Sequence, residues 1–193
     1  MDYNEAKKLL LSINISDCEP FFKNNGYQLE YGYCKLLNND LQEAKNIFCS
    51  IRDVDMRADW AYLFIQFMNN YIQFMPSYLQ VRNFLEIDIG LLIKAHMPEQ
   101  VENVINACDI FYKINQESYK FIARVMLNYN YPTLAKIFLN KGCNYCYNDP
   151  ELHFLYGNYH LLYKNNLLAK HEFQTSLKIL PNYYPAKMML AKL

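Results

Sequence analysis

Apolar residues recur every three or four positions through most of this chain, which is the spacing of an amphipathic helix. The stripe formed by Val101, Val104, Ile105 and Cys108 is one example. Glycine and proline are scarce, with 5 and 7 residues, so the pattern is rarely broken. We therefore predict an all-α fold of about ten to eleven helices. The predicted helices span residues 2–14, 27–38, 41–51, 55–73, 78–95, 98–113, 116–130 and 132–142, two segments within 150–181, and 184–193.

Proline and glycine set several of the predicted boundaries. Pro20 and the cluster Asn24-Asn25-Gly26 predict a loop that lasts until the second helix begins. Pro98 is predicted to start a helix, since proline is favoured at the first helical position. Gly142 is predicted to end one in the left-handed conformation.

Small residues recur at a fixed spacing along the chain. The pairs Gly32 and Ala44, Ala123 and Ala135, and Gly157 and Ala169 are each 12 positions apart. A large residue follows one turn after each alanine, namely Phe48, Leu139 and Phe173. The last two pairs are 34 positions apart. Two helices that pack as a hairpin need small residues where their axes approach, and the large residue then fills the space toward the next hairpin. The spacing therefore predicts repeated helix hairpins.

The last of these units resembles the tetratricopeptide repeat, a 34-residue helix hairpin. His153, Tyr156, Gly157 and His160 stand in the positions of its first cluster, and Ala169, Phe173 and Pro181 stand in those of its second. The resemblance implies an α-solenoid of antiparallel hairpins, wound as a right-handed superhelix. It implies one domain over residues 1–193, with clear repeats at 27–51, 116–142 and 150–181, a degenerate middle at 55–113, and a capping or truncated helix at 184–193.

The same resemblance implies a concave groove, lined by the first helix of each pair, that binds a peptide or a partner helix. Lys120 and Arg124 are one turn apart and share a helix face. Together with Asn158 they are expected to grip a carboxylate or a peptide backbone. This resembles in part the carboxylate clamp of chaperone-binding members, although Phe154 replaces one polar position. The alternative is an ordinary solvated face. By register, the groove residues are Glu117, Lys120, Arg124, Leu127, Asn128, Glu151, Phe154, Asn158 and Leu161.

Composition and charge limit the partners. Of the 193 residues, 52% are hydrophobic and 20% are charged, which is too apolar for a disordered segment. Nineteen basic side chains balance nineteen acidic ones, so the basic excess typical of nucleic-acid binders is missing. No apolar run approaches the ~20 residues of a membrane span. With six cysteines and no signal peptide pattern, we expect a cytoplasmic protein.

The candidate chemistry is weak. Cys143 and Cys146 form a CxxC, but zinc needs two more ligands, and a redox motif needs a βαβ context. His153 and His160 would lie about 10.5 Å apart along a helix, which is too far to share an ion. We expect packed or half-exposed histidines and a CxxC at the end of a loop. The sequence therefore predicts a non-enzymatic interaction scaffold without a metal or a cofactor.

Three alternatives remain open. The first is a helical-hairpin array that binds single-stranded RNA, which the neutral net charge disfavours. The second is a repeat module of a larger enzyme or regulator. The third is self-association through the terminal helix, because Met188, Met189 and Leu190 would form an exposed apolar face.

Overall fold

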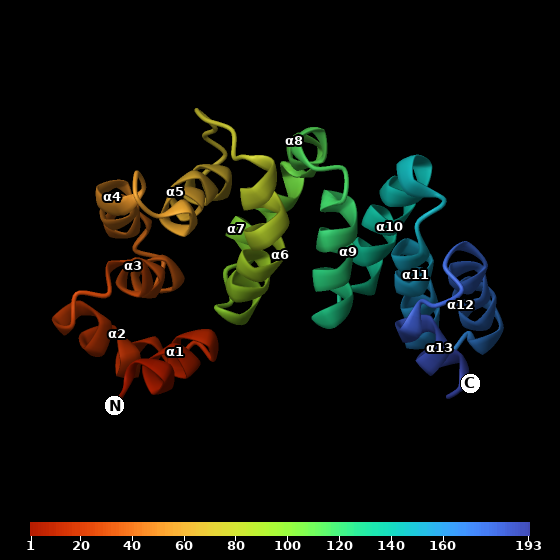
Figure 1. The fold of residues 1–193 in the computed structure, drawn as a ribbon. Coiled ribbons are helices and arrows are strands. Elements are labelled where there is room, and N and C mark those ends of the chain that lie inside the picture. The colour runs from red at the N-terminus through yellow and green to blue at the C-terminus, as the bar shows by residue number, and fades with distance from the viewer. The chain divides into compact units, whose positions relative to one another are not determined.

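All 193 residues are described by the computed structural model, and helices are the only regular secondary structure in it (Figure 1). The all-α prediction is confirmed. The predicted count of ten to eleven helices is wrong, because the chain forms thirteen. These helices form two compact units, Met1–Asn115 and Gln116–Leu193, and each is described by itself. The solenoid arrangement stays a prediction.

The first unit contains eight helices and the second contains five. Those of the first unit are α1 (Tyr3–Leu11), α2 (Ile15–Asn24), α3 (Gln28–Leu37), α4 (Leu41–Ile51), α5 (Met56–Met68), α6 (Tyr78–Lys94), α7 (Pro98–Asn106) and α8 (Cys108–Ile114). Those of the second unit are α9 (Ser118–Asn128), α10 (Pro132–Cys146), α11 (Pro150–Leu162), α12 (Asn166–Ile179) and α13 (Tyr184–Leu190). In both units most helices pack against their neighbours in sequence.

One additional helix, α2, replaces the predicted loop before residue 27. It contains Pro20 in its interior and buries Ile15, Cys18 and Phe22, which follow helical spacing. Pro20 cannot donate a hydrogen bond to the carbonyl of Ser16. Both residues are exposed, so water can solvate that carbonyl. The apolar stripe therefore outweighs the proline.

The other additional helix arises because the predicted helix 98–113 breaks at Ala107 into α7 and α8. The break turns the chain so that Phe111 becomes fully buried. Its ring centroid lies 4.6 Å from that of Phe67 and 6.4 Å from that of Trp60. Burial of an aromatic ring outweighs the continuity of the backbone hydrogen bonds at this point.

Two predicted helix ends are also wrong. Helix α5 stops at Met68, five residues early, because Asn70 adopts a left-handed conformation with φ of 52°. Helix α10 runs through Gly142 to Cys146. Gly142 has no positive φ; instead it makes room for α11, because a Cβ at this position would lie 3.1 Å from Leu152 Cδ1. The sequence predicts a helix end at Gly142 because it does not distinguish a glycine that ends a helix from one that allows close packing.

A single turn geometry recurs after seven of the helices. The second residue beyond each of them has a positive φ: Ile13, Gly26, Asn39, Asn70, His96, Asn130 and Lys164. The amide of the next residue bonds back to a carbonyl five positions earlier, as in Asp40 N to Lys35 O at 2.9 Å. This is the Schellman pattern, which satisfies the free carbonyls of a helix end. Asparagine takes this role at three positions, which is how a chain with 5 glycines forms so many turns.

The hairpins of α3 with α4 and of α11 with α12 share one close contact. The ring of Phe48 covers Gly32, where a Cβ would lie 2.4 Å from Cε1. The ring of Phe173 covers Gly157, where the same distance would be 2.2 Å. The predicted small positions are therefore correct, but the phenylalanine packs on the glycine of its own hairpin. Phe173 also belongs to the core cluster that reaches α13.

We predict that Gly157→Ala destabilises the chain by about 1–3 kcal/mol, because the methyl group must displace the buried ring of Phe173. This holds although alanine has the higher helix propensity by about 1 kcal/mol. Adding Phe173→Leu should restore part of the lost stability. The double variant then has the alanine and leucine that Ala123 and Leu139 provide at the same positions in the hairpin of α9 and α10. Urea unfolding of the single and double variants measures the coupling.

Gly142→Ala is the matched control. Its methyl group would meet only the end of the flexible Leu152 side chain at 3.1 Å, so the loss should be small. Two results would contradict the packing of Phe173 on Gly157: equal losses of stability for the two alanine variants, or additive effects of Gly157→Ala and Phe173→Leu.

Candidate functional site

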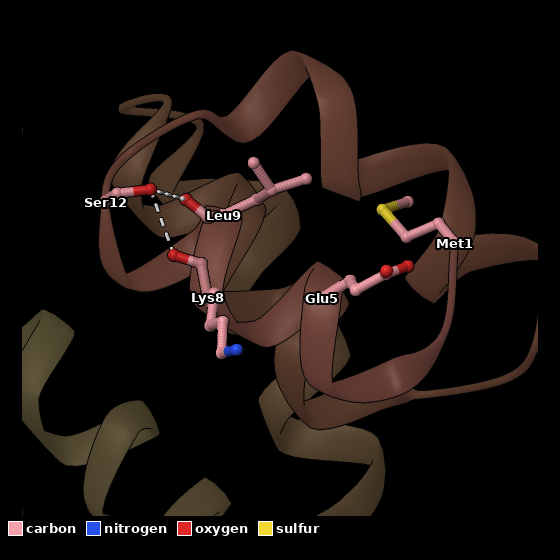
Figure 2. Close-up of a pocket in the computed structure, with 5 residues that line it drawn as sticks. All are labelled: Met1, Glu5, Lys8, Leu9 and Ser12. Atoms are coloured by element: carbon pink, nitrogen blue, oxygen red, sulfur yellow. Dashed lines mark hydrogen bonds between the residues drawn. The ribbon is translucent and has the colours of Figure 1, made fainter.

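A shallow cavity of about 530 Å³, largely open to solvent, lies along α1 (Figure 2). It is lined by Met1, Glu5, Lys8, Leu9 and Ser12. Glu5 accepts a hydrogen bond from Asp2 N at 2.9 Å as part of the helix cap. The Ser12 hydroxyl donates to the carbonyls of Lys8 and Leu9. These groups serve the ends of their own helix, so the cavity has no set of convergent polar groups that would orient a ligand.

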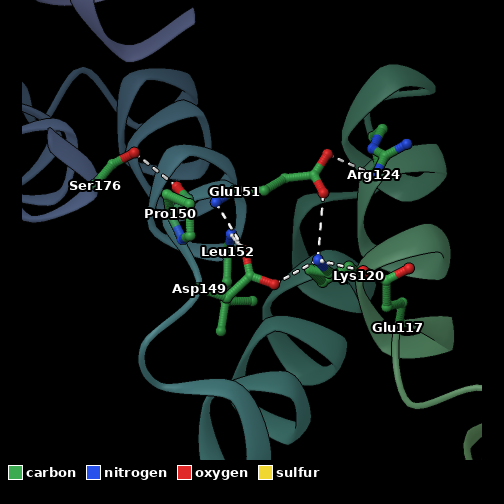
Figure 3. Close-up of polar contacts among 8 residues, drawn as sticks. All are labelled: Glu117, Lys120, Arg124, Asp149, Pro150, Glu151, Leu152 and Ser176. Atoms are coloured by element: carbon green, nitrogen blue, oxygen red, sulfur yellow. Dashed lines mark hydrogen bonds and ion pairs between the residues drawn. The ribbon is translucent and has the colours of Figure 1, made fainter. Parts of the chain in front are cut away.

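The second unit carries a charged centre that begins at Asp149. This residue caps α11, and its Oδ1 accepts hydrogen bonds from Glu151 N at 2.8 Å and Leu152 N at 3.2 Å. An aspartate before Pro150 suits this position, because the cap needs an acceptor and the first helical residue needs no donor. The other oxygen, Oδ2, contacts the ammonium group of Lys120 on α9 (Figure 3).

Lys120 lies at the middle of an ion-pair network between α9 and α11. Its Nζ pairs with Asp149, and also with Glu117 Oε1 and Glu151 Oε2, both at 3.3 Å. Only 4% of its side chain is exposed. Burial by itself lowers the pKa of Lys120, but the hydrogen bond and charge of Asp149 and the other carboxylates outweigh it, so the pKa is raised. Lys120 is therefore held as an ammonium ion.

Arg124 extends the network by one helical turn. Its Nη2 pairs with Glu151 Oε1 at 2.7 Å, so both oxygens of that carboxylate are engaged. The five residues of the network contribute three carboxylates and two cations, whose formal charges sum to −1. The chain itself thus supplies the carboxylates that the sequence analysis expected from a ligand.

An aromatic pair borders this network. The ring of Tyr183 meets that of Phe154 edge-on at 5.8 Å. Burial raises the pKa of the Tyr183 hydroxyl, and the negative charge of Glu151 adds to the increase. Phe154 and Leu161 are half-buried and pack against the core cluster of Ala169, Phe173 and Ala186. These two predicted groove residues therefore have a packing role.

The nine predicted groove residues fall into three groups. Four of them, Glu117, Lys120, Arg124 and Glu151, form the network (Figure 3). Phe154 and Leu161 pack against the core cluster. The remaining three stay accessible, with Asn128 exposed and Leu127 and Asn158 half-buried. The sequence analysis missed Asp149, although its place before a proline at a helix start was a readable capping signal.

The first unit contains a second charged centre, which the sequence analysis also missed. Asp88 on α6 is 2% exposed. It accepts hydrogen bonds from Trp60 Nε1 at 2.6 Å and from the Tyr33 hydroxyl at 3.0 Å, and it pairs with Arg57. The Arg57 guanidinium lies 4.8 Å from the ring centroid of Tyr33 and 4.4 Å from that of Phe84.

This centre joins α3, α5 and α6 and has no free carboxylate oxygen. Burial raises the pKa of the Asp88 carboxyl, while Arg57 and the Trp60 and Tyr33 donors oppose the increase. Because both carboxylate oxygens of Asp88 are bonded to groups of the protein itself, we assign a structural role to this centre. A readable signal existed, since Asp88 lies on the apolar stripe between Leu85 and Leu92.

The cysteine and histidine candidates are also explained by packing. Cys143 and Cys146 lie in the last turns of α10, and not in a loop as predicted. Burial raises the pKa of both thiols, which disfavours the reactive thiolate. No three histidine, cysteine, aspartate or glutamate side chains group as a metal site. His160 packs against the rings of Tyr156 and Tyr159.

His153 is half-buried and has two acceptors. Its Nδ1 lies 2.7 Å from Glu172 Oε2, and its Nε2 lies 2.9 Å from the carbonyl of Tyr147. Both partners can only accept, so the ring must carry two protons to make both bonds. The hydrogen bond to Glu172 accordingly raises the pKa of His153. The His153 ring links α11 to α12 and to the turn after α10.

Comparisons with family models, with curated proteins and with solved structures found no match to this chain. None of its helices is long and apolar enough to cross a membrane.

We predict that the free energy of unfolding falls as the pH rises through the folded pKa of His153. Because that pKa is raised above 6.5, the stabilisation is complete below about pH 6.5 and is lost above the folded value. His153→Gln should flatten this part of the profile measured by urea unfolding. His171→Gln, an exposed histidine on α12, is the control and should leave the profile unchanged. If the free energy of unfolding depended on pH in the same way in the wild type and in His153→Gln, the pH dependence would not come from His153.

Proposed function

We propose that this chain is a helical-repeat scaffold of the tetratricopeptide type that binds a peptide or a partner helix on the shared face of α9 and α11. The observation that carries the proposal is the ion pair between Arg124 and Glu151, at 2.7 Å, which holds the first helices of two consecutive hairpins side by side. The two hairpins are the ones that repeat at 34 residues. We call this surface, formed by Arg124, Leu127, Asn128, Glu151 and Asn158, the α9–α11 face.

The network makes the α9–α11 face rigid before a ligand arrives. Lys120 and Arg124 are fixed by their carboxylates, so little side-chain entropy remains to be lost on binding. Asn128 lies one helical turn beyond Arg124, and Asn158 lies two turns beyond Glu151, so their amide donors and acceptors share these helix faces and suit a peptide backbone. Leu127 adds a half-buried apolar contact.

The charge of the network sets the class of peptide. A ligand carboxylate would join three carboxylates that already surround two cations, and it would be repelled. Side chains of Glu117 and Glu151 remain 45% and 32% exposed, so a ligand cation can approach them. The proposed ligand is therefore a neutral or basic segment, and not the acidic segment that a carboxylate clamp binds.

The same geometry disfavours the two other classes. A catalytic lysine needs a lowered pKa to act as base or nucleophile, whereas the pKa of Lys120 is raised. A phosphate backbone needs cations that are free to pair, whereas Lys120 and Arg124 are neutralised within the chain. All six cysteines are free thiols, which fits the cytoplasmic setting that we propose.

The test is a selection from a random peptide library, followed by fluorescence polarisation with the selected peptides. We expect neutral or basic sequences. Asn158→Lys adds a cation to the α9–α11 face without removing an ion pair, and it should weaken binding about tenfold, or ~1.4 kcal/mol. Thr133→Lys adds the same charge on the exposed side of α10 and should have no effect. Selection of acidic peptides, or equal effects of the two lysines, would contradict the proposal.

A further inference from the structure

The longest uncharged stretch of the chain runs from Trp60 to Val81. These 22 residues contain no Asp, Glu, Lys or Arg, although 20% of the chain is charged. The part up to Met68 is the buried portion of α5. The part that follows, Asn69–Leu79, connects α5 to α6 and begins that helix, and Figure 1 shows the connection projecting beyond the helix ends. We call Asn69–Leu79 the apolar loop.

The apolar loop exposes five large side chains in succession. Tyr71 and Phe74 are each 57% exposed, Met75 is 59% exposed, and Tyr78 and Leu79 are 48% and 53% exposed. About half of each such side chain faces solvent, which amounts to roughly 500 Å² of mostly apolar surface. The largest contiguous patch on a typical monomer is ~300–600 Å², and patches of that size mark interaction sites, so these five side chains are sufficient to form one.

Hydrogen bonds anchor the apolar loop to α5 and to the start of α6. The side chain of Gln66, which is 3% exposed, accepts a hydrogen bond from Gln73 N at 2.9 Å. At the other end Ser77 and Gln80 form a capping box for α6, and Gln80 also donates to Asp59 at 2.7 Å. A surface that is already ordered loses little conformational entropy when it binds.

The chemistry of the apolar loop is self-complementary. In a symmetric dimer, a group near the twofold axis meets its own copy, so a charge there would meet a like charge. The apolar loop has none. Its polar groups are the hydroxyls of Tyr71, Ser77 and Tyr78 and the amides of Asn69, Asn70 and Gln73, which both donate and accept hydrogen bonds. Two such surfaces can therefore pair without charge repulsion. Because each polar group both donates and accepts, the interface does not bury donors without acceptors or acceptors without donors.

We propose that two copies of this chain associate through their apolar loops about a twofold axis. Two patches of this size bury roughly 1,000 Å² together, which is the lower range of specific, weak interfaces. The terminal helix is the less suitable surface, because Met189 and Leu190 pack against the core cluster of α12 and α13. The proposal is independent of the α9–α11 face, which belongs to the other unit.

The test is sedimentation equilibrium of the full chain from about 1 µM to about 1 mM, the range of dissociation constants expected for a small interface. The wild-type mass should rise toward twice the monomer value. Phe74→Asp and Phe74→Lys should each remain monomeric, because each places like charges at the axis. Leu167→Asp is the control, since Leu167 is 84% exposed on α12, and it should associate as the wild type does.

Mixing the two charged variants decides the symmetry. Equal amounts of Phe74→Asp and Phe74→Lys should form a dimer, because opposite charges then meet across the axis, and salt should weaken it. A wild type that stays monomeric throughout the range would overturn the proposal, as would a mixture that does not associate. A monomer that binds neutral lipid vesicles through Phe74 would also overturn it and would assign the apolar loop to a membrane surface.

Discussion

The contact between a glycine and a phenylalanine is the constraint on which the α3–α4 and α11–α12 hairpins depend. Phe173 occupies the place where any other residue at Gly157 would carry its Cβ, and Phe48 does the same at Gly32. The ring can be buried only if the two helices approach closely, and the helices can approach only if the glycine is present. This reciprocal requirement fixes both the spacing and the register of the two helices, and it explains why the sequence shows the pair at a constant separation.

The two charged centres, around Asp88 and around Lys120, differ in how far the chain encloses them. In the first, Asp88 is enclosed by three donors and has no oxygen left for a ligand. In the second, the network around Lys120 opens toward Glu117 and Glu151, which remain partly exposed. A closed ionic centre specifies how helices meet, whereas an open one also sets the electrostatic potential that a ligand encounters. This difference adds to the Arg124–Glu151 ion pair as support for placing the proposed function on α9 and α11.

The helices and their small residues were predictable because both depend on local spacing, and Gly157 and Phe173 are examples. The proline in α2 and the break at Ala107 were not, since tertiary burial of Phe22 and Phe111 outweighed the local signal. For the site, register placed Lys120 and Arg124 on one face of α9, where both pair with Glu151. The register of one helix does not show which carboxylates a neighbouring helix contributes. The ion pairs that changed the expected ligand could therefore be found only in the structure.

Hydrogen–deuterium exchange of the full chain, with and without a library-selected peptide, tests the central claim most directly. The claim is that ligands bind the α9–α11 face of the second unit. It predicts that the peptide slows exchange of amides in α9 and α11, and leaves the apolar loop and the cavity along α1 unchanged. Slower exchange confined to the first unit, with α9 and α11 unaffected, would contradict it.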